Sequence, residues 1–113
     1  MTDSEINLAI AKIEYPDAAY IDINSEESED VEVCYKYTIN NKVLDYTSHF
    51  DYVNNLADIG PIFEREKIPI SYSPIYKVWK EGYGMHDFNG RIKDKSLTKT
   101  LALCYLKMKG VEV

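Results

Sequence analysis

This 113-residue chain contains two cysteines and two histidines, the residue types of a Cys₂His₂ zinc site: Cys34, His49, His86 and Cys104. A tetrahedral zinc site of the Cys₂His₂ kind would need all four. Such sites usually contain a local pair, for example two cysteines separated by two residues, and no two of these residues lie at that spacing. We therefore expect neither a metal site nor a bound cofactor.

Nucleophilic catalysis would need an activated serine or cysteine. Ser48 precedes His49 directly, but no nucleophile elbow or glycine-rich oxyanion turn accompanies them. Cys104 falls on the apolar face of an expected helix, where a thiol is unreactive. The sequence thus contains no recognisable nucleophile.

Paired carboxylates and glycine-rich loops are the remaining catalytic signals. Asp45 with Asp51 or Asp58 would suit general acid–base chemistry, and the sequence leaves that pairing open. Gly82 and Gly84 do not form a phosphate loop, because the rest of that fingerprint and its strand-to-helix turn are missing. We expect a protein that is not an enzyme.

An acidic stretch is the first candidate for binding. Four acidic side chains fall within five positions: Glu26, Glu27, Glu29 and Asp30. Runs of like charge commonly form a solvated loop. They also attract a basic surface on a partner and speed association. Both interpretations are open.

An aromatic segment that contains glycines is the second candidate. Its large side chains include Trp79, Tyr83, His86 and Phe88. Aromatic residues in such a loop anchor interfaces. They also close one end of a hydrophobic core, since large rings seldom stay fully exposed.

The composition indicates a globular domain and restricts its partners. Apolar residues make up 45% of the chain, and we expect residues 1–113 to form a single domain. The net charge of −6 argues against direct nucleic-acid binding, which needs a basic face. The charge is uneven, however: residues 1–55 contain 12 acidic and 3 basic side chains, and residues 56–113 contain 7 acidic and 10 basic ones.

The sequence lacks the signals of membrane insertion and secretion. No apolar run approaches the ~20 residues that a membrane-spanning helix needs, and residues 1–5 are acidic rather than basic. We expect a cytoplasmic protein that does not contact a membrane. Because that compartment is reducing, we expect Cys34 and Cys104 to be free thiols, although a disulfide between them is possible.

Periodicity in the first half predicts a helix followed by strands. A capping box at Thr2 and Glu5 starts a helix with a stripe of isoleucines, and Asn7 on its other side should face water. Residues 20–23 suggest a short strand. Residues 31–39 alternate apolar and polar side chains, and a two-residue asparagine turn leads to a return strand over residues 42–46.

The second half predicts helix, hairpin and helix. Residues 54–67 have a helical stripe that includes Leu56, and Pro61 either breaks this span, which we favour, or kinks one helix. Residues 68–71 and 75–80 look like strands, the first an edge strand because of Pro69. Ser96 caps a last helix whose buried face runs from Leu97 to Met108, with Gly110 beyond its end. The fold class is therefore α+β: a small antiparallel sheet of hairpins packed against about three helices.

Three stretches carry a family resemblance: Leu8–Lys12, Gly60–Ile68 and Cys104–Val113. In the central one, Gly-Pro-Ile leads into Glu-Arg-Glu and then an apolar residue. They resemble the NinX family of small proteins encoded by temperate phages of enteric bacteria. The chain departs from that family at Leu56, where members often have tryptophan, and at Leu103, where they tend to have arginine.

The resemblance implies a phage or prophage origin and action inside the host bacterial cell, and it supplies no catalytic residue. We expect an accessory protein that binds a host or phage protein, in one version through a basic surface on that partner. Inhibition of a host defence system is the version of this hypothesis that we favour. The alternative is a small-molecule- or nucleotide-binding protein or an enzyme, with its site in the loop of residues 82–90. Self-association through tyrosines is a third reading, and the oligomeric state stays open.

Overall fold

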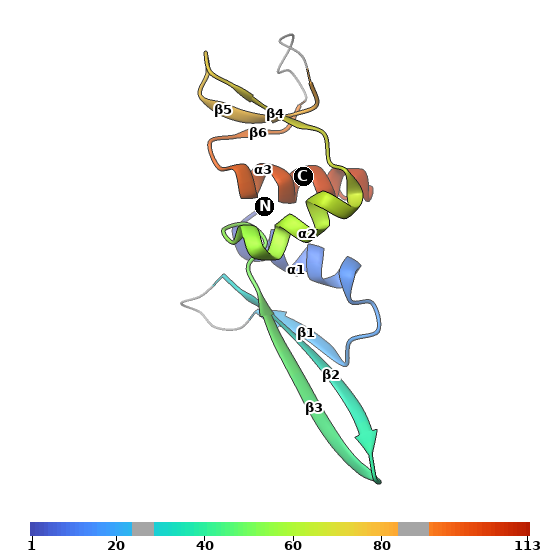
Figure 1. Cartoon of the computed structure of the whole chain (residues 1–113). Coiled ribbons are helices and arrows are strands. Elements are labelled where there is room, and N and C mark those ends of the chain that lie inside the picture. Colours follow the sequence, from blue (N-terminus) through green and yellow to red (C-terminus); the bar gives the residue numbers. More distant parts are fainter. Residues whose placement is uncertain (24–28, 84–90) are drawn as a thin grey trace. The chain divides into compact units, whose positions relative to one another are not determined.

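The computed structural model describes residues 1–23, 29–83 and 91–113. These residues form three helices and two small antiparallel sheets, so the fold is α+β, as predicted (Figure 1). The chain divides into two compact units, unit 1 (Met1–Asp51) and unit 2 (Tyr52–Val113); that residues 1–113 form a single domain stays a prediction. None of the helices in the described ranges is long and apolar enough to span a bilayer.

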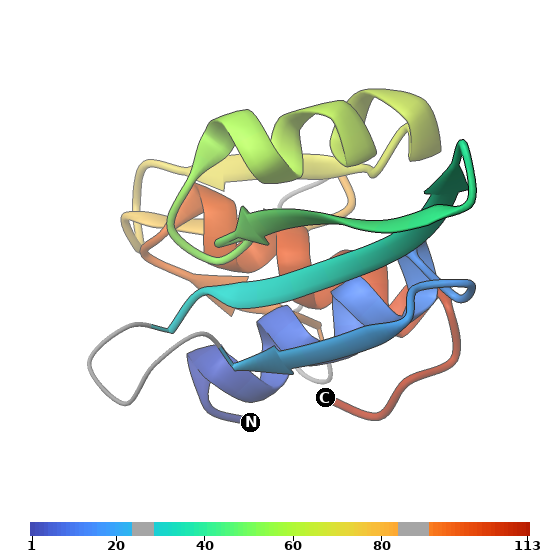
Figure 2. The same cartoon turned by 90° about the horizontal axis from the view of Figure 1, so that it is seen from below.

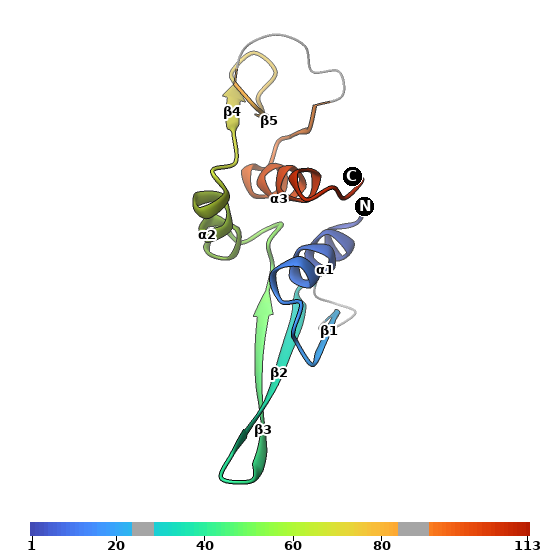
Figure 3. The ribbon, with the colours of Figure 1, turned by 90° about the vertical axis from the view of Figure 1, so that its right-hand side faces the viewer.

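Unit 1 combines one helix with one sheet. Its elements are α1 (Asp3–Glu14), β1 (Tyr20–Ile23), β2 (Val31–Ile39) and β3 (Lys42–Phe50). The strands lie in the order β1-β2-β3, and both pairings are antiparallel. Helix α1 packs against β1 and β2 (Figure 2). The hairpin of β2 and β3 continues well past the end of β1 (Figure 3).

Helix α1 begins with the predicted capping box. The backbone N–H of Glu5 donates to Thr2 Oγ1, and the backbone N–H of Thr2 donates to Glu5 Oε1, each over 3.2 Å. The bond from the Thr2 backbone is the main reason that the pKa of Glu5 is lowered. The helix ends before Pro16, and Ile6 and Ile10 on its inner face are fully buried.

The β2–β3 hairpin turns at the two predicted asparagines. Asn40 and Asn41 have φ angles of 53° and 66°, a left-handed conformation that asparagine tolerates better than most residues. Two successive residues of this kind make a type I′ turn, whose twist matches that of the strands. The register accordingly pairs Ile39 with Lys42. Strand β3 then runs on to Phe50, further than the sequence pattern predicted.

Unit 2 places a small sheet beside two helices. Its elements are α2 (Leu56–Glu66), β4 (Ile70–Ser73), β5 (Val78–Glu81), β6 (Lys93–Asp94) and α3 (Leu97–Met108). The strands lie in the order β4-β5-β6, so β4 is an edge strand, as Pro69 before it predicted. Helix α3 packs against α2, β5 and β6.

The predicted break at Pro61 is wrong, because α2 is one helix with Pro61 inside it. Proline removes the N–H that would donate to the carbonyl of Ala57, one turn earlier. Ala57 is exposed, so water can bind that carbonyl and the helix continues. Asn55 caps the helix through a hydrogen bond of 2.9 Å from the Ala57 N–H. At the other end Lys67 has a φ of 52° and terminates it.

The hairpin of unit 2 is offset from its predicted position. Strands over residues 68–71 and 75–80 were expected, whereas β4 begins at Ile70 and β5 at Val78. Residues 74–77 form the turn instead, and Lys77 leaves the extended region with a φ of 55°. Strand β6 was not predicted, since two residues are too few for an alternating pattern.

Helix α3 has the predicted ends. Ser96 Oγ accepts a hydrogen bond of 3.2 Å from the Lys99 N–H. Gly110 follows the helix with a φ of 82°. Its N–H donates to the Lys107 carbonyl, and the Val111 N–H donates to the carbonyl of Leu106. These two bonds make a Schellman motif, which satisfies the last carbonyls of the helix.

Three side chains contradict the predicted burial, and a fourth was not placed by the sequence. Leu56 and Met108 were expected in the core but are 52% and 49% exposed. Each is a terminal residue of its helix, where fewer neighbours surround a side chain. Asn7, expected to face water, is fully buried, and so is Thr100, which the sequence analysis did not place.

Candidate functional site

The acidic stretch is described only in part. Glu26 and Glu27 lie outside the described residues. Glu29 is exposed and Asp30 half-buried just before β2. The backbone carbonyl of Glu29 accepts a hydrogen bond of 2.8 Å from Nδ2 of the buried Asn7. At least this end of the stretch therefore has a structural role in unit 1.

The aromatic segment divides between two places in unit 2. Trp79 lies half-buried in β5, and its ring centroid is 5.0 Å from that of Tyr72 on the neighbouring strand. Tyr83 is 74% exposed. His86 and Phe88 lie outside the described residues. The two described members of this candidate site thus make different contacts.

A groove lies beside Tyr83 in unit 2. It has a volume of about 790 Å³ and lies between α2 and the first turns of α3. Its lining is mainly apolar and includes Leu56, Pro61, Phe63 and Leu101. The central stretch of the family resemblance therefore supplies one wall of this groove.

The candidate catalytic groups can be compared only where they lie in one unit of the described structure, so a pair of Asp45 with Asp58, one from each unit, stays a prediction. His49 Nε2 lies 3.5 Å from a carboxylate oxygen of Glu32, its cross-strand partner. Within the described ranges, no three His, Cys, Asp or Glu side chains are grouped so that they could hold a metal ion. Asp45 and Asp51 are separated by six residues along an extended strand and its continuation, about 20 Å, too far to share a proton.

Both thiols are free and buried. Cys104 lies in α3 beside the ion pair of Lys107 Nζ and Glu81 Oε1, whose atoms are 2.6 Å apart. Burial of the thiol, and then the negative charge of Glu81, raises the pKa of Cys104 to about 12. At neutral pH almost none of it is the reactive thiolate.

Asn7 is a structural residue that the sequence analysis placed wrongly. Its Nδ2 donates to the Glu29 carbonyl and, over 3.0 Å, to Oδ1 of Asp51. These partners lie just before β2 and just after β3, so one amide group joins α1 to both strands at the base of the hairpin. A buried amide needs such partners, because an unsatisfied one would cost about 1–3 kcal/mol.

The feature that the sequence analysis missed is the outer part of the β2–β3 hairpin. Four of its large apolar side chains are strongly exposed: Tyr37 (43%), Ile39 (51%), Leu44 (41%) and Tyr46 (60%). The register sets Tyr37 opposite Leu44 and Tyr35 opposite Tyr46. Directly opposed residues share a face of the sheet, so these five residues form one surface. We call it the apolar hairpin face.

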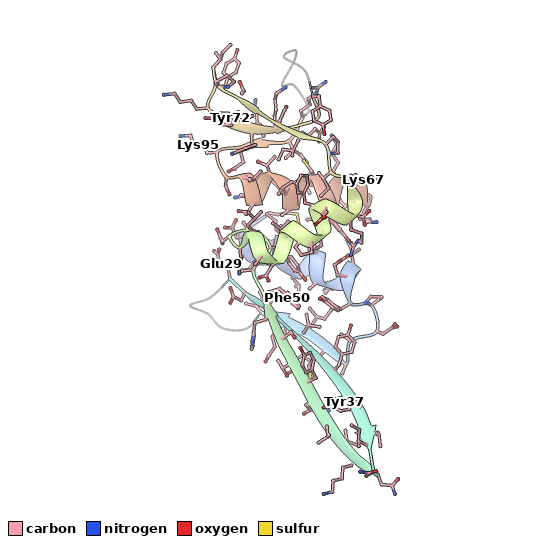
Figure 4. The ribbon with its side chains drawn as sticks, in the orientation of Figure 1. Glu29, Tyr37, Phe50, Lys67, Tyr72 and Lys95 are labelled. Atoms are coloured by element: carbon pink, nitrogen blue, oxygen red, sulfur yellow. The ribbon has the colours of Figure 1, made fainter. Side chains whose placement is uncertain are left out.

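The opposite face of the outer hairpin, seen in the next cross-strand pairs (rungs), is more polar. There the register pairs Lys36 with Asp45 and Thr38 with Val43. Beyond the core of unit 1 the hairpin therefore has its larger apolar surface on one side, and the other side combines polar residues with Val43, which is 67% exposed. Figure 4 shows Tyr37 out along the hairpin, away from Phe50 at its base.

The exposure follows from the lengths of the elements. The core side of the hairpin is closed by Tyr15, which stacks on Phe50 at 5.2 Å and meets the edge of Tyr35 at 6.0 Å between ring centroids. A 12-residue helix such as α1 is about 18 Å long, whereas a nine-residue strand such as β2 is about 30 Å long. The helix therefore cannot cover the whole hairpin. The sequence signal that could have revealed this surface is a comparison of lengths. Nine residues alternate in β2, and the 12-residue helix α1 is too short to cover a strand of that length.

Comparisons with known proteins identify no relative from which a role could be transferred. No family model matches this sequence, and neither a curated protein nor a solved structure matches the chain. The role of the hairpin is therefore inferred from its own residues and their geometry.

Proposed function

We propose that this protein acts by binding another protein through the apolar hairpin face. The observation that carries the proposal is the exposure of Tyr37, Ile39, Leu44 and Tyr46 on one side of one hairpin. Contiguous apolar surface on a soluble protein commonly marks an interaction site. Tyrosine suits such a site, because it contributes a large contact area at low entropic cost.

Charge specifies the kind of partner. Unit 1 contains 12 acidic and 3 basic side chains. A partner with a basic rim around an apolar centre would be drawn to this unit and oriented by it. A second copy of the chain would instead bring two acidic units together, so charge disfavours self-association.

The biological setting is part of the same proposal and is supported by the resemblance to the NinX family. A phage accessory protein of this kind would meet its partner inside a bacterial host. A small acidic protein that covers a basic surface competes with nucleic acid for it. Inhibition of a host defence system would be one consequence of that competition.

The proposal is tested by affinity capture from host cells with wild-type protein and two paired variants. The first pair, Tyr37→Ser with Leu44→Ser, removes one rung of the apolar hairpin face. The control pair, Thr38→Ser with Val43→Ser, changes the next rung on the opposite face. We expect one partner to be captured by wild type and control, and its affinity to fall at least about tenfold with the first pair.

Both pairs change exposed side chains, so circular dichroism should show folded protein in each case. Capture of the same partner by all three proteins would contradict the proposal. A second contradicting result would be that the first pair leaves capture intact, whereas replacing both Glu29 and Asp30 by lysine abolishes it. Binding would then depend on the acidic stretch and not on the apolar hairpin face. Failure to recover any partner, where a control interaction survives, also counts against it.

A second candidate function is supported by the groove of unit 2. Its apolar lining and its volume of about 790 Å³ are typical of a small-molecule site. A ligand that binds only folded protein raises the unfolding midpoint. A thermal-shift screen against metabolites and nucleotides, with Phe63→Ala as the groove variant, would distinguish this function from protein binding.

A further inference from the structure

The outer edge of β3 differs from the other sheet edges of the described structure. Strand β3 is nine residues long and, among the strands of residues 1–23, 29–83 and 91–113, pairs only with β2. Its register is continuous from Lys42 to Phe50, without a bulge, and it contains no proline. The other edge strands, β1, β4 and β6, have four, four and two residues. Short strands are one of the ways in which proteins prevent unwanted strand pairing, and β3 does not use it.

The turn determines which backbone groups of β3 point outward. In a two-residue type I′ hairpin the residues next to the turn, Ile39 and Lys42, form a hydrogen-bonded pair. Hydrogen-bonded and non-hydrogen-bonded pairs then alternate along the strands. The residues whose N–H and C=O groups point away from β2 are therefore Val43, Asp45, Thr47 and His49.

A hydrogen bond on the other side of β2 agrees with this alternation. Cys34 lies opposite Thr47, so its carbonyl should point away from β3. That carbonyl accepts a hydrogen bond of 2.7 Å from the N–H of Ala19, next to β1. The alternation derived from the turn therefore holds along the hairpin as far as Cys34.

We propose that the β3 edge binds an extended segment of the partner as an additional strand. This inference rests on the proposed function and specifies how the partner docks. An added strand would hydrogen-bond to the four outward residues and extend the apolar hairpin face beside Leu44 and Tyr46. The other face of the added strand would lie beside Asp45, whose negative charge favours lysine or arginine there. The segment therefore alternates apolar residues with polar ones that include lysine or arginine.

The probe is a synthetic capped heptapeptide that alternates valine and isoleucine with threonine and lysine. Amide hydrogen exchange of the whole protein is followed by NMR with and without it. We expect exchange to slow at least about tenfold at Val43, Asp45, Thr47 and His49. The amides of Leu44 and Tyr46 should change little, because they already donate to β2.

Two proline substitutions provide matched variants. Thr47→Pro removes an outward N–H from the β3 edge, where an edge strand tolerates proline. Thr38→Pro does the same on the opposite edge of the hairpin, beyond the end of β1. Both threonines are exposed and lie on the same face. Peptide affinity should fall at least about tenfold with Thr47→Pro and should be unchanged with Thr38→Pro.

The possible outcomes separate this inference from the proposed function. Absence of peptide binding, or protection at Lys36 and Thr38 instead, overturns strand addition at β3. The inference is also overturned if, without peptide, amide exchange at the β3 edge becomes slower as the protein concentration rises. The strand that pairs with β3 would then belong to a second copy of the chain. If the partner captured from host cells depends on Tyr37 and Leu44 but not on Thr47, the hairpin face binds it without strand addition. The proposed function then stands while this inference fails.

Discussion

The two ends of the β2–β3 hairpin have the same sequence pattern and opposite surroundings. At the base, Val31 and Val33 are essentially inaccessible to solvent. Toward the turn, Tyr37 and Ile39 continue the same alternation on the same face, yet about half of each side chain is exposed. Period-two alternation therefore identifies a strand with one apolar face, but it does not distinguish a face that packs in the core from one that is left open.

The two ends of the hairpin differ more in the types of their residues than in how apolar those residues are. The base uses valines, whereas Tyr35, Tyr37 and Tyr46 populate the outer part. A tyrosine ring can pack against a partner while its hydroxyl stays hydrated in the free protein. The tyrosines of the outer part thus suit both a free and a bound state.

The largest expected effect concerns the base of the hairpin. Asn7→Asp keeps the shape of the side chain but places a buried carboxylate beside that of Asp51. We expect a loss of about 3 kcal/mol in the free energy of unfolding at pH 7, because both charges are held close together. Urea unfolding followed by circular dichroism measures it.

This effect should depend on pH in a defined direction. Burial and the neighbouring carboxylate raise the pKa of the new carboxyl in the folded state, so the loss grows as pH rises above the ordinary value of ~3.9 and is smaller at pH 4. Asn40→Asp at the exposed turn is the matched control, with a change of about 0.5 kcal/mol or less. Equal losses in both variants would mean that the Asn7 bonds do not hold the base.

A pair of identical substitutions compares the two ends directly. Val33→Ala removes two methyl groups from a buried site, and we expect it to cost about 2 kcal/mol. Val43→Ala removes the same groups from a side chain that is 67% exposed, and its effect should stay within about 0.5 kcal/mol. Similar losses measured by urea unfolding would show that the outer part is covered in the free protein.

A smaller effect is expected at the turn. Asn41→Val places a β-branched side chain at a φ of 66°, which costs about 1 kcal/mol. Because α1, the helix described in unit 1, is too short to cover the outer part of the hairpin, this cost should appear as faster amide exchange near Tyr37 and Leu44, while the amide of Val33 keeps its protection. Asn41→Gly, which fits the turn, should leave exchange unchanged. Faster exchange throughout β2 would mean that both ends open together.

Local signals in the sequence predicted much of the fold. The capping box at Thr2, the asparagine turn, the Ser96 cap and the glycine after α3 are each determined by neighbouring residues. Pro61 was misjudged because the outcome depends on whether one carbonyl can be hydrated. Asn7 was misjudged because its partners, Glu29 and Asp51, are far away in sequence.

The candidate site was harder to predict than the fold. The alternation of β2 was recognised, but the exposure of its outer half depends on the length of another element. Of the residues chosen as binding candidates, Glu26, Glu27, His86 and Phe88 lie outside the described residues. Trp79 contacts Tyr72 within its own sheet, and Tyr83 borders the groove of unit 2. A binding role for these six residues, and for Glu29 and Asp30, stays a prediction.

The contact between Trp79 and Tyr72 also bears on how unfolding can be observed. Trp79 is the single tryptophan of the chain and belongs to unit 2, while unit 1 contains tyrosine but no tryptophan. Selectively excited indole fluorescence therefore reports on unit 2 alone, and far-ultraviolet circular dichroism reports on both units. If residues 1–113 unfold as one cooperative domain, the two signals change together along a denaturant series. Separate midpoints would give each unit its own stability.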